Sequence, residues 1–317
     1  MANLSEQSDE SGFRHKIEDL WLRAIRTYTF NTPIKKGSYR LFKYAMALCR
    51  RPHRSLRVDL RDGRKLWVNL TTGMQETVFF HGEFEVPITE MARELVDFGD
   101  TCLDIGANYG WYTTLFASVV KGQGQVHSFE PVPVTFAELK RNHELMGSPA
   151  NVKINNVALG DEPGTITMNF FDGEPTGHAS IATKGATPSD SFECPMITLD
   201  SYLAENKIGK VDFVKVDIEG AELMMLKGAT RLFTGEKLPI ILMEMALAQS
   251  ANFGYVPNDL IQFIAEHGDH DFYRVEEDDH KLVKIDVFAS GDIGANVFCI
   301  PRTASERVRK VVEKYSK

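Results

Sequence analysis

The sequence has few of the features that mark a secreted, membrane-spanning or zinc-dependent protein. Its four cysteines lie far apart, with no C-x-x-C pair and no His/Cys cluster, so neither a zinc site nor a redox pair is predicted. No segment approaches the roughly 18 consecutive apolar residues that a membrane span requires, and the first ten residues are too polar for a secretory signal. We therefore expect a cytoplasmic protein with reduced thiols.

The sequence also lacks an excess of basic residues. Its formal net charge is −8, which disfavours a nucleic-acid backbone as the main partner. The charge is unevenly distributed: residues 1–55 contain eleven Lys/Arg and five Asp/Glu, a balance of +6, which leaves −14 for residues 56–317. The basic part keeps contact with an acidic partner open.

Helical spacing of apolar residues runs from Ile17 to Cys49. We predict that residues 1–55 form a basic helical extension and residues 56–317 the main domain, with a core over 76–301. The preferred interpretation of the extension is a cap on the domain edge or an arm in a homo-oligomer. Peripheral contact with a membrane surface stays open, because the helices are basic and amphipathic.

The main domain begins with a predicted β-hairpin over Leu56–Asn69, with a turn at Asp62-Gly63. Predicted strands and helices then alternate, which indicates an α/β, doubly wound, mostly parallel sheet with an antiparallel edge at the end of the chain. The expected strands are Thr101–Ile105, Gln125–Phe129, Val152–Leu159, Val211–Asp217 and Ile240–Met245, with edge strands over Asp271–Glu276, Lys281–Phe288 and Asn296–Pro301. The expected helices are Glu90–Phe98, Trp111–Val120, Val134–Met146, Ala221–Phe233 and Asn258–Glu266. The segment Gly164–Phe171 is strand-like where simple alternation would give a helix.

The first core strand ends in Asp104-Ile-Gly-Ala-Asn-Tyr-Gly110, and ligands of such sheets bind beyond the carboxyl ends of the strands. A dinucleotide site would need glycine at positions 104, 106 and 109, so Asp104 and Tyr109 argue against a nucleotide-dependent oxidoreductase. A carboxylate at Asp104 repels a pyrophosphate but suits a ligand with an ammonium and a sulfonium. Glu130 ends the second strand, where it can accept two hydrogen bonds from a ribose diol.

Further motifs lie at the ends of the next strands: Asn156-Val-Ala-Leu-Gly-Asp161 at the third, and Lys215-Val-Asp-Ile-Glu-Gly220 at the fourth. Together with Phe129-Glu-Pro131, Thr198-Leu-Asp200 and Leu226-Lys-Gly-Ala229, these motifs resemble FkbM-family methyltransferases over roughly residues 76–245. The resemblance implies a class I methyltransferase (Rossmann-like) fold, S-adenosyl-L-methionine as cofactor, and O-methylation of a hydroxyl on a small molecule such as a sugar or natural product.

By position, the resemblance assigns the methionine part of the cofactor to Asp104, Gly106, Ala107, Asn108 and Gly110. The ribose is assigned to Glu130, with Pro131 beside it, and the adenine border to Asn156, Val157 and Ala158. Asp217 and Glu219 are placed at the methyl-transfer end, and Glu85, within Gly82-Glu-Phe-Glu85, is expected to close one side of the pocket.

An alcohol acceptor needs a general base within about 3 Å of its hydroxyl oxygen. The candidates are Asp217, Glu219, Glu244, His81 and His178, of which Asp217 and Glu219 have the best positions. Asp217, Glu219 and Glu244 could instead hold Mg²⁺, although direct binding of an amino group or of substrate hydroxyls is the preferred interpretation, so no metal site is predicted. His178 lies in a Gly/Pro-rich loop that could close over the substrate.

Two other functions stay open at this point. One is an RNA methyltransferase, which the basic extension permits and the acidic main domain disfavours. The other is a non-catalytic binding module that keeps the fold without the chemistry. We expect a small-molecule hydroxyl acceptor rather than a nucleic acid as the partner.

Overall fold

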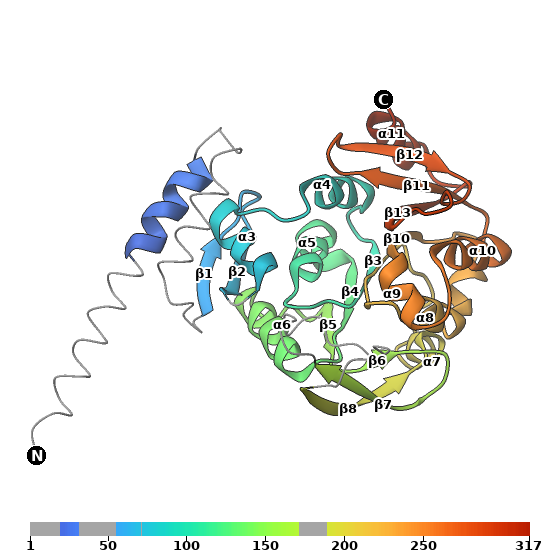
Figure 1. Cartoon of the computed structure of the whole chain (residues 1–317), viewed down its shortest axis with the longest axis horizontal. Helices are drawn as coiled ribbons and strands as arrows, with labels where there is room; N and C mark the ends of the chain where they lie inside the picture. The colour runs from blue at the N-terminus through green and yellow to red at the C-terminus, as the bar shows by residue number, and fades with distance from the viewer. Residues whose placement is uncertain (1–19, 32–54, 71, 171–188) are drawn as a thin grey trace, which may run out of the picture. The chain divides into compact units, whose positions relative to one another are not determined.

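The computed structural model describes residues 20–31, 55–70, 72–170 and 189–317 (Figure 1). The chain divides into two compact units, Met1–Phe84 and Glu85–Lys317. The boundary between the compact units falls between Phe84 and Glu85. The predicted domain division between residues 55 and 56 stays a prediction. In the described part of the chain, no helix is long and apolar enough to span a membrane.

The N-terminal unit contains a helix over residues 20–31, the strands β1 (Ser55–Asp59) and β2 (Lys65–Asn69), and the helix α3 (Gly73–His81). The two strands pair antiparallel, so the predicted hairpin is confirmed. Gly63 at the turn has φ 84°, a conformation that glycine adopts without strain. The Thr29 hydroxyl donates to the Phe80 carbonyl at 2.7 Å and ties the first helix to α3. Of the predicted Ile17–Cys49 helical segment, only residues 20–31 lie within the described residues.

The C-terminal unit is built on an eight-stranded sheet of order β12-β11-β13-β10-β9-β3-β4-β5. Its parallel part consists of β3 (Thr101–Ile105), β4 (Gln125–Phe129), β5 (Val152–Asn155), β9 (Phe213–Val216) and β10 (Ile240–Ala246). Strand β13 (Gly294–Pro301) pairs antiparallel with both β10 and β11 (His270–Glu276), and β12 (Lys281–Ile285) completes the edge. The predicted mostly parallel sheet with an antiparallel edge is thus confirmed.

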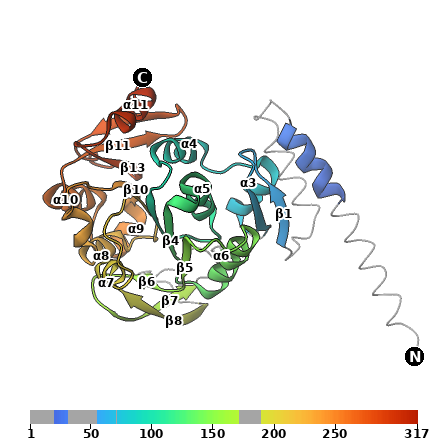
Figure 2. The same ribbon diagram turned by 180° about the vertical axis from the view of Figure 1, so that it is seen from behind.

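The helices of this unit are α4 (Val86–Leu95), α5 (Trp111–Val120), α6 (Pro133–Leu145), α7 (Leu199–Glu205), α8 (Glu222–Lys227), α9 (Leu247–Asn252), α10 (Pro257–His267) and α11 (Glu306–Tyr315), with short 3₁₀ turns at Lys121–Gln123 and Thr230–Phe233. The predicted helix over 221–233 is therefore split into α8 and a 3₁₀ turn. Helices α7, α9 and α11 were not predicted. Figure 2 shows the same elements from behind.

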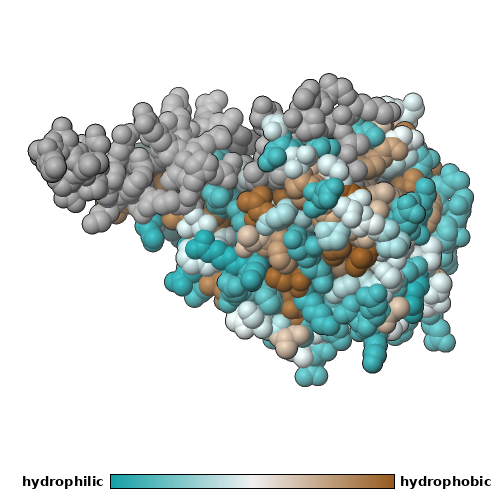
Figure 3. Space-filling view, turned by 90° about the horizontal axis from the view of Figure 1, so that it is seen from below, coloured by the Kyte–Doolittle hydropathy of each residue, from teal (hydrophilic) through white to brown (hydrophobic). Residues whose placement is uncertain are grey.

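The predicted strand Val152–Leu159 is wrong as a single element. The chain leaves the large sheet at Asn155, and β6 (Ala158–Leu159) joins a separate sheet of order β6-β8-β7 with β7 (Gly164–Phe170) and β8 (Asp190–Ile197). The break occurs at Asn156, whose amide donates to the carbonyls of Glu130 (2.8 Å) and Pro131 (2.9 Å) and turns the chain. Figure 3 views the molecule from the side of β7 and β8, where apolar residues are scattered among polar ones.

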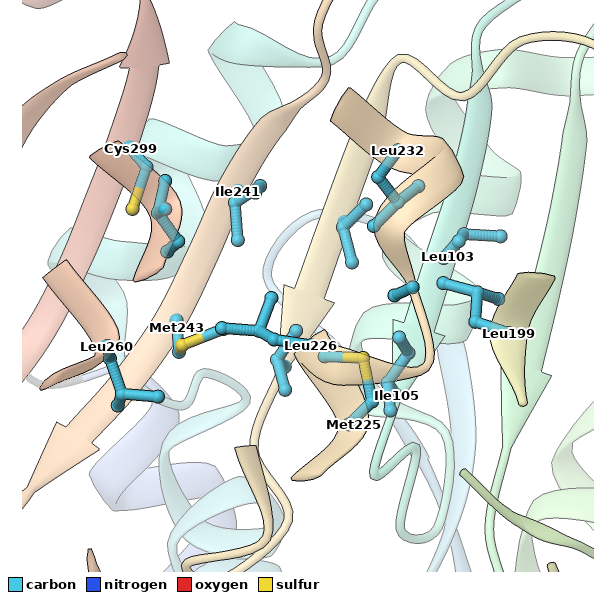
Figure 4. Close-up of a cluster of buried hydrophobic side chains, with 14 of the residues drawn as sticks. Leu103, Ile105, Leu199, Met225, Leu226, Leu232, Ile241, Met243, Leu260 and Cys299 are labelled. Carbon is cyan, nitrogen blue, oxygen red and sulfur yellow. The ribbon is translucent and has the colours of Figure 1, made fainter. Parts of the chain in front are cut away.

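Successive side chains of a strand point alternately to the two faces of the sheet, and each face is covered by a different layer of helices. Leu103 and Ile105 of β3 face the main core, where they gather with Leu226 of α8 and Leu260 of α10 (Figure 4). Because successive strand residues point to opposite faces, Asp104 faces the other layer, where it contacts α5. This alternation governs the chemistry of the site.

Candidate active site

The loop from β3 to α5 brings two strand ends into close contact. Gly106 has φ 80°, and a Cβ at this position would lie 1.8 Å from the carbonyl oxygen of Asp217. The backbone N–H groups of Gly106 and Ala107 donate to the Phe129 carbonyl at 3.0 and 2.9 Å. Gly110 has φ 96°, and a Cβ there would lie 2.8 Å from a methyl carbon of Leu139. The glycines therefore permit the turn after β9 and helix α6 to approach the loop.

Asp104 is completely buried beneath this loop. One carboxylate oxygen accepts a 2.6 Å hydrogen bond from Thr113 of α5, while the other has no hydrogen-bond partner among the described residues. Burial is the main cause that raises the pKa of Asp104. Its predicted contact with the cofactor remains a prediction, since the carboxylate faces α5 and does not line the cavity described below.

Glu130 lies at the carboxyl end of β4 and is 5% exposed. One of its oxygens accepts from the Asn108 N–H at 2.8 Å and the other from the Val132 N–H at 2.9 Å. Burial raises the pKa of Glu130 to about 7. A carboxylate offers about four lone-pair sites, so two acceptor positions remain, the number that a vicinal diol requires.

An apolar cavity of about 40 Å³ lies beside these strand ends. It brings together four residues predicted to bind cofactor, Gly106, Pro131, Val157 and Ala158. Seven further residues complete its lining: Ile105, Phe129, Leu159, Ile166, Met168, Ile218 and Ala221. Asn156 instead holds the backbone of Glu130 and Pro131. All the lining residues are apolar or glycine, and such a surface suits a flat apolar ring.

Carboxyl groups and one lysine gather at the ends of β3, β9 and β10; we call Glu85, Asp104, Lys215, Asp217 and Glu244 the acidic cluster. Lys215 is 5% exposed, and its Nζ lies 2.8 Å from Asp217. The charges of Asp217, Asp104 and Glu85 all act on Lys215 and raise its pKa to about 12 against the opposing effect of burial. The cluster therefore places four carboxyl groups around one cation.

Tyr112 of α5 joins the cluster through two contacts. Its hydroxyl donates to Glu85 at 2.7 Å, and Lys215 Nζ lies 5.1 Å from the centre of its ring.

The sequence analysis assigned no role to Lys215, although Lys215 and Asp217 are two residues apart on one strand and hence lie on one face of the sheet. That spacing was the available signal.

Burial, together with neighbouring negative charge, raises the pKa values of two glutamates. The pKa of Glu85 rises to about 7, mainly because of burial and also because of Asp217. The pKa of Glu244 rises to about 8 through burial, the charges of Asp217 and Glu219, and a hydrogen bond with Asp217. A hydrogen bond between two carboxyl groups requires a proton on one of them. Such perturbed groups are typical of functional sites.

The remaining predicted site residues, His81, His178 and Glu219, are not part of the acidic cluster as defined above. His81 belongs to the N-terminal unit, where its carbonyl accepts from Arg61 at 2.8 Å. His178 lies outside the described residues. Glu219 has φ 56° in the turn after β9. Within residues 20–31, 55–70, 72–170 and 189–317, no group of three or more His, Cys, Asp or Glu side chains could hold a metal ion.

The strand order, the glycine loop after β3 and the acid at the end of β4 define a class I methyltransferase-type α/β fold. The sequence profile described as methyltransferase FkbM domain matches residues 104–270, more than half of the chain. The chain belongs to the FkbM methyltransferase family, as its motifs predicted.

Two curated relatives illustrate the range of this similarity. The chain is 26% identical over 182 residues to hexuronic acid methyltransferase AglP of Haloferax volcanii, covering 57% of this chain and 68% of the relative. It is 29% identical over 160 residues to 31-O-demethyl-FK506 methyltransferase FkbM of Streptomyces tacrolimicus, covering 41% of this chain and 59% of the relative. The matched region therefore spans about three fifths to two thirds of these relatives.

Among solved structures, an FkbM methyltransferase from Methylobacillus flagellatus matches with a TM-score of 0.39 and 16% identity, over 63% of this chain and 43% of that chain. A SAM-dependent O-methyltransferase from Thermotoga maritima matches with a TM-score of 0.37 and 12% identity, over 80% of each chain. The fold assignment rests on the strand order and the family match rather than on these distant similarities.

Proposed function

We propose that this protein is an S-adenosylmethionine-dependent methyltransferase that methylates a hydroxyl group of a small molecule. The observation that carries the proposal is the acidic cluster, in which Lys215 is surrounded by carboxyl groups beside an apolar cavity. A ligand with a flat apolar ring, a diol and a positively charged end matches these three parts of the site. The relative named as a 31-O-demethyl-FK506 methyltransferase supports transfer to an oxygen atom, and the relative named as a hexuronic acid methyltransferase supports a small-molecule substrate.

Each part of the cofactor would be bound by residues of matching chemistry. Pro131, Val157 and Ala158 would border the adenine, and Glu130 would bind the ribose hydroxyls with its two remaining acceptor positions. Asp217 and Glu244 would face the cationic end, where negative charge is concentrated. S-adenosylmethionine, when bound, supplies an activated methyl group on a positively charged sulfur.

Glu244 is the preferred general base of this chain. Its pKa of about 8 lies close to neutral pH, where a base combines the correct ionisation state with sufficient basicity. Lys215, 2.8 Å from Asp217, stabilises the negative charge of that carboxylate, and this charge favours the proton on Glu244 in the absence of ligand. A cation bound nearby would stabilise the ionised form of Glu244 and prepare it to accept the acceptor's proton.

The proposal is tested by calorimetric titration with S-adenosylmethionine, S-adenosylhomocysteine and NAD. Wild type should bind the first two saturably and NAD not at all, and Glu130→Gln should weaken both by about tenfold because a charged hydrogen-bond acceptor is lost. Glu205→Gln, an exposed change on α7, is the matched control. Absence of binding by wild type would contradict the proposal, and binding without transfer to any sugar or macrolide hydroxyl would leave a binding module.

A further inference from the structure

The turn between β9 and α8 carries both kinds of chemistry found in the site. Asp217 at its start belongs to the acidic cluster, while Ile218 and Ala221 line the apolar cavity. A small movement of this turn would therefore change the charged and the apolar halves of the site together.

The backbone of this turn is conformationally demanding. Glu219 and Gly220 both have positive φ, 56° and 104°. A Cβ at Gly220 would lie 2.6 Å from the carbonyl oxygen of Gln249 and 2.9 Å from the Phe253 ring, so the turn is packed tightly against the segment after β10. Non-glycine residues in this region are strained and persist only where surrounding contacts hold them.

Those contacts come from Glu222, the first residue of α8, which is 3% exposed. One carboxylate oxygen accepts from the N–H groups of Ile218 at 3.2 Å and Gly220 at 3.1 Å. The other lies 2.8 Å from the hydroxyl of Tyr255, which also lies 2.9 Å from the Gly220 carbonyl. Glu222 thus binds both ends of the strained part of the turn, and Tyr255 anchors it to the segment between α9 and α10.

We propose that Glu222 and Tyr255 form a positioning pair that fixes the turn Asp217–Ala221, so that the acidic cluster and the apolar cavity are aligned for one ligand. This inference rests on the proposed function. Neither residue is a catalytic residue, because each acts through the backbone of the turn. The carboxyl group of Glu222 is suited to this role, because one of its oxygens accepts from both backbone N–H groups while the other faces the Tyr255 hydroxyl.

The test compares Glu222→Gln and Tyr255→Phe with Tyr202→Phe. Tyr202 is a matched control: it is also buried, and its hydroxyl also has two side-chain partners, His127 at 2.9 Å and Asn155 at 3.1 Å, outside the cavity lining. Two quantities are measured: hydrogen exchange of the Ile218 and Gly220 amides, and calorimetric affinity for S-adenosylhomocysteine.

We expect Glu222→Gln and Tyr255→Phe to accelerate exchange at both amides and to weaken S-adenosylhomocysteine binding by about tenfold, the effect of weakening a buried hydrogen bond. Tyr202→Phe should lower the unfolding temperature by a similar amount and leave both quantities unchanged. Wild-type affinity in the Glu222 and Tyr255 variants, or an equal loss in Tyr202→Phe, overturns the pairing. If wild type itself fails to bind, the proposed function fails, and amide exchange alone decides whether the pair fixes the turn.

Discussion

The two ends of strands β9 and β10 differ in size and chemistry. A cavity of about 470 Å³ lies at the amino ends, with Lys210, Arg231 and Lys237 in its lining. At the carboxyl ends the apolar cavity is only about 40 Å³, but it lies beside the acidic cluster with its strongly shifted pKa values. In this comparison, buried ionisable groups rather than the volume of a cavity favour the carboxyl ends as the proposed active site.

The largest effect that distinguishes the two ends is expected from the buried lysine. Lys215→Met leaves the surrounding carboxyl groups without their cation, and breaking a buried ion pair in this way should lower the free energy of unfolding by about 3–5 kcal/mol. Urea denaturation measures the loss. Lys237→Met, at the exposed amino-end cavity, is the control. Equal stability of the two variants would show that Lys215 does not compensate the cluster.

The second effect concerns charge recognition at the carboxyl ends. Asp217→Asn removes a negative charge near the expected sulfonium, so affinity for S-adenosylmethionine should fall about tenfold more than affinity for uncharged-sulfur S-adenosylhomocysteine. Calorimetric titration of both ligands gives this ratio. A parallel loss for both ligands would assign Asp217 to the part of the pocket that does not sense the sulfur.

Some parts of the fold and of the site could be predicted from the sequence, and others could not. The bounds of β3, β4 and α5 were predicted correctly, because compact apolar runs are bounded there by glycine and charged residues. The interruption of Val152–Leu159 could not be predicted, because it depends on Asn156 bonding the backbone of another strand end. Sequence spacing likewise located Asp104 correctly at a strand end, but only the packing of α5 shows that its carboxylate accepts from Thr113.

Lys215 illustrates the same limit in electrostatics. A lysine in an apolar strand is an ordinary observation, and its significance comes from Asp104 and Glu85, which approach it from other segments of the chain. The pKa values of Glu85 and Glu244 likewise arise from burial and neighbouring charges that the sequence alone does not place together.

The third effect is a dependence of binding and stability on pH. The pKa of Glu244 is raised from 4.5 to about 8 in the folded protein, so the unfolded chain releases this proton first and stability falls as pH rises from about 4.5 to 8. Binding of a cation favours ionised Glu244, so affinity for S-adenosylmethionine should rise by up to about tenfold per pH unit below pH 8. Titration from pH 6 to 9 measures the slope. Glu244→Gln should flatten it, and an unchanged slope in that variant would assign the proton to Glu85 or Glu130, whose pKa values are both raised to about 7.

The smallest effect is expected at the amino ends. Arg231 and Lys237 are exposed, and in the part of the chain that the structure describes neither forms an ion pair. Arg231→Gln and Lys237→Gln should therefore change the free energy of unfolding by no more than about 0.5 kcal/mol. They should also leave S-adenosylhomocysteine affinity unchanged, as measured by urea denaturation and calorimetry. A clear loss of affinity in either variant would mean that the cavity at the amino ends affects ligand binding at the carboxyl ends through β9 and β10. The two ends would then not be functionally separate.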